Sequence, residues 1–184
     1  MFATTPAGLS GVGRHRVPGA ARWHRFATIS PSDGPTSRRP GQENDPVRIR
    51  TGRDGDVELL LAFWGSAAHG TSVSDDAAGV AALLAHDPQA VLIAEVDGVV
   101  VGTLIAGWDG WRCHLYRLAV APEHRRAGIA RALLAAARER FLALGGRRID
   151  AMVDDTNTQA HALYRAADYR SQPSWTRWVH PLGG

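Results

Sequence analysis

The stretch VAPEHRRAGIARALLAAARERF, residues 120–141, constrains the fold more than any other part of the sequence. It runs from the apolar end of a strand through a proline and a basic loop into a long helix that begins after Gly128. Glycine lets the backbone approach a ligand closely where a Cβ would collide. Because the start of a helix offers free N–H groups and a positive dipole end, the stretch predicts an anion site, most often a phosphate site. A plain strand-to-helix turn is the alternative.

Strand and helix patterns alternate along the chain from residue 46 onward. Strand patterns cover 46–50, 90–96, 99–107, 112–120, 147–153 and 174–182, and helical patterns cover 53–70, 72–88, 129–144 and 156–167. Asp97-Gly98 between two apolar runs predicts a hairpin, and Ser74 is the expected N-cap of the second helix. Gly145 should end the third helix. The alternation predicts one α/β domain over residues 46–184.

The composition rules out several function classes. All 21 basic residues are arginine, so the chain lacks the lysine of a Walker phosphate loop and of a Schiff-base enzyme. The only cysteine, Cys113, can form neither an intramolecular disulfide nor a cysteine-based zinc cluster, and no metal site is predicted. No apolar run is long enough to cross a bilayer. We therefore expect a cytoplasmic protein without a membrane partner.

Residues 1–45 differ from the rest of the chain. They are rich in Gly, Pro, Ser, Thr and Arg and show no hydrophobic period, which predicts a disordered tail. Six arginines outnumber three acids there, so the tail carries the whole formal charge of +3. A transit peptide and a nucleic-acid-binding arm are alternatives. Because the remaining residues are neutral in sum, no nucleic-acid partner is predicted.

Two motifs resemble the signatures of the GNAT superfamily of acetyl-CoA-dependent N-acetyltransferases. RRAGIA at 125–130 matches the family's Arg/Gln-x-x-Gly-x-Gly/Ala signature, and LAVAPEH before it matches the family's strand-then-proline lead-in. The second signature, an asparagine followed by an alanine and then Leu-Tyr, is matched by Asn157, Ala160, Leu163 and Tyr164. The resemblance covers about residues 46–182.

The resemblance implies a GNAT-type α/β fold, in which helices flank a mixed, mostly antiparallel sheet. The strands at 112–120 and 147–153 should run parallel and splay apart to admit the cofactor arm. One departure is visible, because Asp168-Tyr169 stands where the family usually has Gly-Phe after its last helix. Aspartate tolerates the left-handed conformation, so we expect this change to affect stability more than chemistry.

The resemblance also implies a binding site for acetyl-CoA as cosubstrate. The residues that would hold its pyrophosphate are Arg125, Arg126, Ala127, Gly128, Ile129 and Ala130. Leu118 and Val120 would pair with the pantetheine arm, and Asn157 would bind that arm from the other side. Tyr164 belongs to this site and is also the family's position for the proton donor.

Acetyl transfer needs a neutral amine, a donor for the oxyanion and a proton for the departing thiolate. By the resemblance, the oxyanion donor is a backbone N–H near Val120, and Tyr164 supplies the proton. The candidates for the base are His114, whose ordinary pKa range suits the task, and the strand acids Glu95 and Asp150. Each has a structural alternative, and ordered water is a further alternative to a dedicated base.

Two groups of side chains near these candidates need an interpretation. His114 is expected to share one strand face with Tyr116, Leu118 and Val120, whereas Cys113 on the other face is expected in the core. Four tryptophans lie near strand ends: Trp108, Trp111, Trp175 and Trp178. Aromatic walls suit an amine carried on an apolar or planar body, although we expect core packing for at least two of the four.

The sequence thus predicts an N-acetyltransferase that moves an acetyl group from acetyl-CoA to a primary amine. The acceptor would be a small molecule, a peptide or a protein. A non-catalytic acyl-CoA-binding sensor on the same scaffold is the alternative. The sequence leaves open the identity of the amine and whether the chain forms a homodimer.

Overall fold

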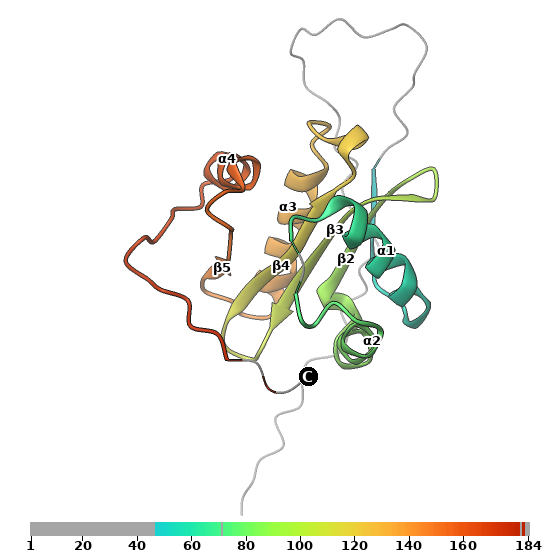
Figure 1. Cartoon of the computed structure of the whole chain (residues 1–184), viewed down its shortest axis with the longest axis horizontal. Coiled ribbons are helices and arrows are strands. Elements are labelled where there is room, and N and C mark those ends of the chain that lie inside the picture. Colours follow the sequence, from blue (N-terminus) through green and yellow to red (C-terminus); the bar gives the residue numbers. More distant parts are fainter. Residues whose placement is uncertain (1–46, 71, 181, 183–184) are drawn as a thin grey trace, which may run out of the picture. The chain divides into compact units, whose positions relative to one another are not determined.

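The computed structural model describes residues 47–70, 72–180 and 182, so the expected tail at 1–45 lies outside the described residues. The elements are β1 Arg48–Thr51, η1 Asp54–Asp56, α1 Val57–Ala67, α2 Ala77–His86, η2 Pro88–Ala90, β2 Val91–Val96, β3 Val99–Trp108, β4 Cys113–Val120, η3 Pro122–His124, α3 Ile129–Ala143, β5 Ile149–Ala151 and α4 Thr158–Ala166 (Figure 1). None of the described helices is long and apolar enough to cross a membrane.

The five strands form one sheet in the order β1-β2-β3-β4-β5. The first four strands are antiparallel to their neighbours, and β5 is parallel to β4, which confirms the mixed, mostly antiparallel α/β prediction. Asp97 and Gly98 join β2 to β3 with φ values of 52° and 75°. Two positive φ values suit the right-handed twist of a hairpin, as the Asp-Gly pair predicts.

Helices cover both faces of the sheet. On one face, the apolar stripe of α3, which includes Leu133 and Phe141, packs against residues of β2, β3 and β4. On the other face, α1 and α2 contribute Leu60, Trp64 and Leu84 to a second cluster of buried residues. Strand residues alternate between these two clusters because successive side chains point to opposite faces of a sheet.

A β-bulge interrupts this alternation in β4. Thr103 pairs with Ala119 and Ile105 pairs with Tyr116, so Leu104 of β3 lies opposite two residues, Arg117 and Leu118. Arg117 has a φ of 50°, in the left-handed region. A bulge of this kind turns the following side chains to the other face of the sheet.

The bulge corrects one prediction from the sequence. Tyr116 pairs with Ile105, which belongs to the cluster under α1 and α2, whereas Leu118 and Val120 pack against the cluster under α3. The expectation that His114, Tyr116, Leu118 and Val120 share one face is therefore wrong beyond Tyr116. Strict alternation cannot anticipate an inserted residue.

β4 and β5 diverge soon after they meet. Cys113, His114 and Leu115 pair with Ile149, Asp150 and Ala151. Beyond Leu115, no described strand pairs with that edge of β4, as expected for splayed strands. The edge of β4 that carries the bulge is therefore open.

Two further predictions about local structure are wrong. The N-cap of α2 is Asp76, not Ser74, because the Asp76 carboxylate accepts a hydrogen bond from the N–H of Gly79 at 2.6 Å. The described residues at 174–180 form no strand, and the N–H of Trp175 donates a hydrogen bond to the nearby carbonyl of Gln172. The alternation of that segment is strand-like, but no described strand offers it a partner.

Candidate functional site

The start of α3 presents unused backbone donors. Gly128 is the N-cap and has a φ of 83°, a conformation that L side chains rarely adopt. The first hydrogen bond of the helix runs from the N–H of Ala132 to the carbonyl of Gly128 at 3.0 Å. Among the described residues, the N–H groups of Ile129 and Ala130 have no acceptor. This arrangement can bind an anion.

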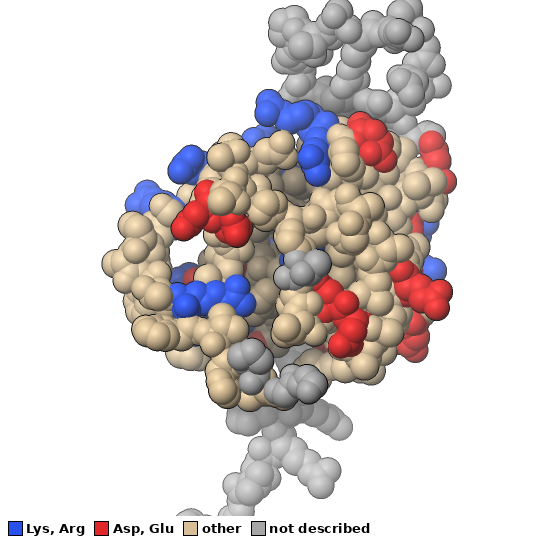
Figure 2. Space-filling view, viewed as in Figure 1, with Lys and Arg blue, Asp and Glu red and all other residues tan. Residues whose placement is uncertain are grey.

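The space in front of these donors is open. A Cβ placed on Gly128 would meet no atom within 4 Å. The side chains of Arg125 and Arg126 are exposed beside it, and basic residues gather over the part of the surface where α3 begins (Figure 2). Arg125 Nε donates to the carbonyl of Val120 at 3.2 Å, which fixes the loop to the end of β4.

α4 forms the other wall of the gap beside β4. Figure 2 shows the surface hollowed between the part that carries α4 and the part that carries β4. Asn157 is the N-cap of α4, and its Oδ1 accepts a hydrogen bond from the N–H of Ala160 at 3.0 Å. One face of the helix carries Asn157, His161 and Tyr164, because His161 is four residues after Asn157 and Tyr164 is three residues after His161. His161 Nε2 lies 3.2 Å from the carbonyl oxygen of Asp154, at the end of the β5–α4 loop.

Tyr164 is suited to hold a proton. Burial, together with neighbouring Tyr169, raises the pKa of Tyr164 to about 12. The two rings meet edge to face with their centroids 5.1 Å apart. Tyr164 therefore stays protonated across neutral and alkaline pH, as a proton donor must. Asp168, in the place of the family's glycine, has a φ of 64°, as expected for a residue that tolerates this conformation.

The structure separates the three candidates for the base. His114 is half-buried, and the centroid of its ring lies 5.9 Å from that of the Tyr116 ring. Its pairing partner on β5 is Asp150. His114 and Asp150 are thus brought together where β4 and β5 begin to diverge. Asp150 is also paired with Arg148 at 3.0 Å.

Glu95 lies in a different environment. Its carboxylate accepts a hydrogen bond from Arg50 Nε at 2.6 Å, and the same guanidinium binds Asp56 at 2.7 Å. Burial alone would raise the pKa of Asp56, but the Arg50 hydrogen bond and the N–H of Arg53 lower it below its usual range. This network ties β1 and β2 to the start of α1, which gives Glu95 a structural role.

Core packing was predicted for at least two of the four tryptophans, but only one of them packs against a core cluster. Trp108 packs against the cluster under α3, but the side chains of Trp111, Trp175 and Trp178 are 73%, 79% and 91% exposed. The Arg112 guanidinium lies 4.3 Å from the centre of the Trp111 ring. The missing final strand explains the difference, since Trp175 and Trp178 belong to it. Cys113 is fully buried in the core, as predicted, and burial raises the pKa of its thiol.

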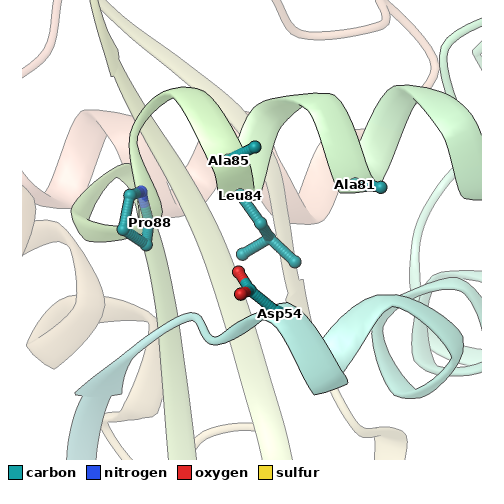
Figure 3. Close-up of a pocket in the computed structure, with 5 residues that line it drawn as sticks. All are labelled: Asp54, Ala81, Leu84, Ala85 and Pro88. Atoms are coloured by element: carbon teal, nitrogen blue, oxygen red, sulfur yellow. The ribbon is translucent and has the colours of Figure 1, made fainter.

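A pocket lies between η1 and α2, away from these residues. Its lining residues are Asp54, Ala81, Leu84, Ala85 and Pro88 (Figure 3). Asp54 is the only charged group among them, and none belongs to the 125–130 loop or to α4. The described residues contain no group of three or more side chains that could hold a metal ion.

Sequence reasoning missed a set of polar residues behind the bulge of β4. Thr103 and Trp64 are buried and hydrogen-bonded to each other, and Arg117 forms an ion pair with Asp75. Nothing in the local sequence marks these residues, because their partners lie between 14 and 42 positions away.

Comparisons with known proteins agree with this fold. The family model for the Acetyltransferase (GNAT) family matches residues 58–169. An acetyltransferase of Sodalis glossinidius is 34% identical over 128 residues, which is 70% of this chain and 90% of the relative. An acetyltransferase of Yersinia pestis is 31% identical over 126 residues, or 68% of this chain and 89% of the relative.

Solved structures show the same architecture. An aminoglycoside antibiotic 6'-N-acetyltransferase of Acinetobacter haemolyticus has a TM-score of 0.60 at 18% identity, covering 74% of this chain and 99% of that one. A putative acetyltransferase of Salmonella typhimurium, solved with its cofactor acetyl-CoA, has a TM-score of 0.55 at 21% identity, covering 66% and 80%. At these identities the likeness shows the fold.

Proposed function

The chain belongs to the GNAT family of acetyl-CoA-dependent N-acetyltransferases, and we propose that it acetylates a primary amine of a small molecule or of a peptide or protein. The observation that carries the proposal is the pair of unused N–H groups at the start of α3, next to Gly128, where an added Cβ would meet no atom within 4 Å. Two charged phosphates are the part of the cofactor that such donors suit best.

The open edge of β4 is suited to bind the pantetheine arm of the cofactor. A pantetheine arm carries amide groups that can pair with an unpaired strand edge. Leu118 and Val120 lie on that edge, beyond the point where β5 leaves β4. Asn157 at the start of α4 would bind the arm from the opposite side, with the pyrophosphate on the 125–130 loop.

The proposed reaction uses one proton acceptor and one proton donor. His114 takes a proton from the acceptor amine, whose nitrogen then attacks the thioester carbonyl, and a backbone N–H near Val120 stabilises the oxyanion. When the carbon–sulfur bond breaks, Tyr164 gives its proton to the thiolate, and the excess proton left on the attacking nitrogen returns through water to the Tyr164 phenolate. The products are an acetylated amine and the free thiol of coenzyme A. The raised pKa of Tyr164 keeps its hydroxyl in the protonated form that this step uses.

A thiol-release assay tests the proposal. The chain is incubated with acetyl-CoA and, separately, with polyamines, amino acids, aminoglycosides and peptides, and free coenzyme A is measured. We expect amine-dependent release with at least one class and an acetylated product by mass spectrometry. If acetyl-CoA binds but none of these amines releases coenzyme A, the non-catalytic sensor is the better description.

A further inference from the structure

The bulge of β4 is held in an unfavourable backbone conformation. Arg117 has a φ of 50°, and a non-glycine residue keeps this strained left-handed conformation only where its surroundings hold it. The bulge also lies next to the point where β4 loses its β5 partner. Contacts other than pairing with β5 must therefore hold this side of the strand.

A buried relay fixes the carbonyl of Arg117. The Thr103 hydroxyl donates to that carbonyl at 3.1 Å, and Trp64 Nε1 donates to the Thr103 oxygen at 3.0 Å. Thr103 is fully buried and Trp64 is 5% exposed. With water excluded, a broken bond in this relay would leave a buried polar group without a partner.

The guanidinium of Arg117 is fixed as well. Its Nε donates to Asp75 Oδ1 at 2.8 Å, a second nitrogen donates to the other oxygen of the same carboxylate, and Nη1 donates to the carbonyl of Gly70 at 3.0 Å. The two side chains are only 13% and 16% exposed. The loop between α1 and α2 is thus bound directly to the bulge.

These contacts determine where the next peptide group points. A trans peptide unit is planar, with its C=O and N–H pointing in opposite directions. Since the Arg117 carbonyl is directed at Thr103, the N–H of Leu118 points away from Thr103. Leu118 lies on the strand edge that the proposed function assigns to the pantetheine arm, two residues before Val120, so its N–H is a candidate for the backbone donor near Val120 that stabilises the oxyanion.

We propose that Thr103 and Asp75 are positioning residues for acetyl transfer, which act through Arg117 to aim the N–H of Leu118 at the thioester carbonyl. The inference rests on the proposed function, because it assumes that acetyl-CoA lies along β4. By this proposal, Asp75 in the loop between α1 and α2 influences the N–H of Leu118, which polarises the acetyl carbonyl. Neither residue touches the reacting atoms.

The test compares acetyl-CoA with coenzyme A, because only the former carries the carbonyl. In Thr103→Val and Asp75→Asn, we expect the affinity for acetyl-CoA to fall about threefold to tenfold and kcat about tenfold or more. The affinity for coenzyme A should stay within about twofold, since the phosphate loop is untouched. Thr103→Ser and Asp75→Glu, which keep the hydroxyl and the carboxylate, should restore most of both losses.

A matched ion pair serves as the control. Arg140 pairs with Asp87 and donates to the carbonyl of Ala106 at 3.2 Å, so it repeats the chemistry of Arg117 away from the bulge. Asp87→Asn should lower the melting temperature without changing kcat or the ratio of the two affinities. If Thr103→Val does not fold, Trp64→Phe removes the first donor of the relay and is measured instead.

The outcomes separate the inference from the proposed function. Equal losses for acetyl-CoA and coenzyme A, or losses in Asp87→Asn as large as in Asp75→Asn, would show a merely structural role and overturn the inference. If the parent protein binds neither ligand, or releases no coenzyme A with any amine, the proposed function itself fails.

Discussion

The proposed cofactor side and the proposed acceptor side of this molecule are built differently. The cofactor side, residues 120–131, offers backbone donors around Gly128 on a helix whose stripe is buried in the core. We expect the acceptor side at the described residues of segments 68–76, 109–112 and 170–180, where large side chains such as Trp178 are exposed and little backbone pairing occurs. Backbone donors suit a cofactor that never changes, whereas side chains can vary with the amine.

The largest expected effect is on the cofactor side. Gly128→Val places a branched side chain in front of the donors and strains a residue with a φ of 83°. We expect affinity for coenzyme A to fall about 100-fold or more, equivalent to about 2.7 kcal/mol. The rise in melting temperature that coenzyme A produces in the parent should disappear.

The other end of the same helix provides the control. Gly145 has a φ of 81°, and a Cβ there would also meet nothing within 4 Å. Gly145→Val should therefore cost similar backbone strain but retain the coenzyme A response. If both variants respond to coenzyme A as the parent does, the phosphate site does not lie at Gly128.

Tyr164→Phe has the next largest expected effect and tests whether Tyr164, between the two sides, donates the proton to the thiolate. It removes one hydroxyl and keeps the ring that packs against Tyr169. General-acid catalysis is typically worth about 10²- to 10⁴-fold, but a thiolate leaves tolerably unaided, so we expect kcat to fall at least about tenfold. Acetyl-CoA affinity should be unchanged.

The pH dependence sharpens this prediction. The pKa of Tyr164 is raised to about 12, so its donor form persists at every pH below that value. The loss in Tyr164→Phe should therefore be the same at pH 7 and pH 9, measured with a confirmed acceptor where chemistry limits the rate. Turnover equal to that of the parent would remove Tyr164 from the mechanism.

The backbone structure of the segment 120–131 could be predicted from sequence because its signals are local. The strand, the proline, Gly128 and the helical stripe follow one another within about thirty residues, and each has one preferred structure. The hairpin at Asp97-Gly98 and the end of α3 near Gly145 were predictable for the same reason. Each depends on a positive φ at or next to a glycine.

The bulge of β4 and the proposed acceptor side could not be predicted, because their structure depends on distant partners. The bulge at Arg117 is held by Thr103 and Asp75, which lie 14 and 42 positions away, so alternation assigned Leu118 and Val120 to the wrong face. The expected strand at 174–182 shows the same limit, since a strand pattern does not name the edge that it joins. Ser74 and Asp76 are both good caps, and only the observed bond to Gly79 distinguishes them.

His114→Gln should have a smaller effect, because water can replace a base. We expect kcat/KM for the amine to fall about fivefold near pH 7, which is less than the usual range for base catalysis. The loss should shrink toward pH 10, where more of a primary amine arrives without its proton. His86→Gln, at an exposed position in the last turn of α2, is the control and should leave the profile unchanged. A loss independent of pH would indicate that His114 positions the amine instead.

The smallest expected effect belongs to the exposed aromatic residues of the acceptor side. Trp178 is 91% exposed and packs against nothing that its removal would destabilise, so Trp178→Ala should leave the melting temperature within about one degree. If its ring forms a wall for a cationic or planar amine, an exposed cation–π contact worth about 0.5–1 kcal/mol predicts a two- to fivefold rise in KM for that amine. kcat and the affinity for acetyl-CoA should not change, because the ring contacts neither the thioester nor the phosphates. Val99→Ala, at an exposed apolar position in the β2–β3 hairpin, is the control and should leave KM unchanged. An equal KM for Trp178→Ala and the parent across apolar, planar and cationic amines would show that this segment takes no part in acceptor choice, and would confine acceptor recognition to the loops at 68–76 and 109–112.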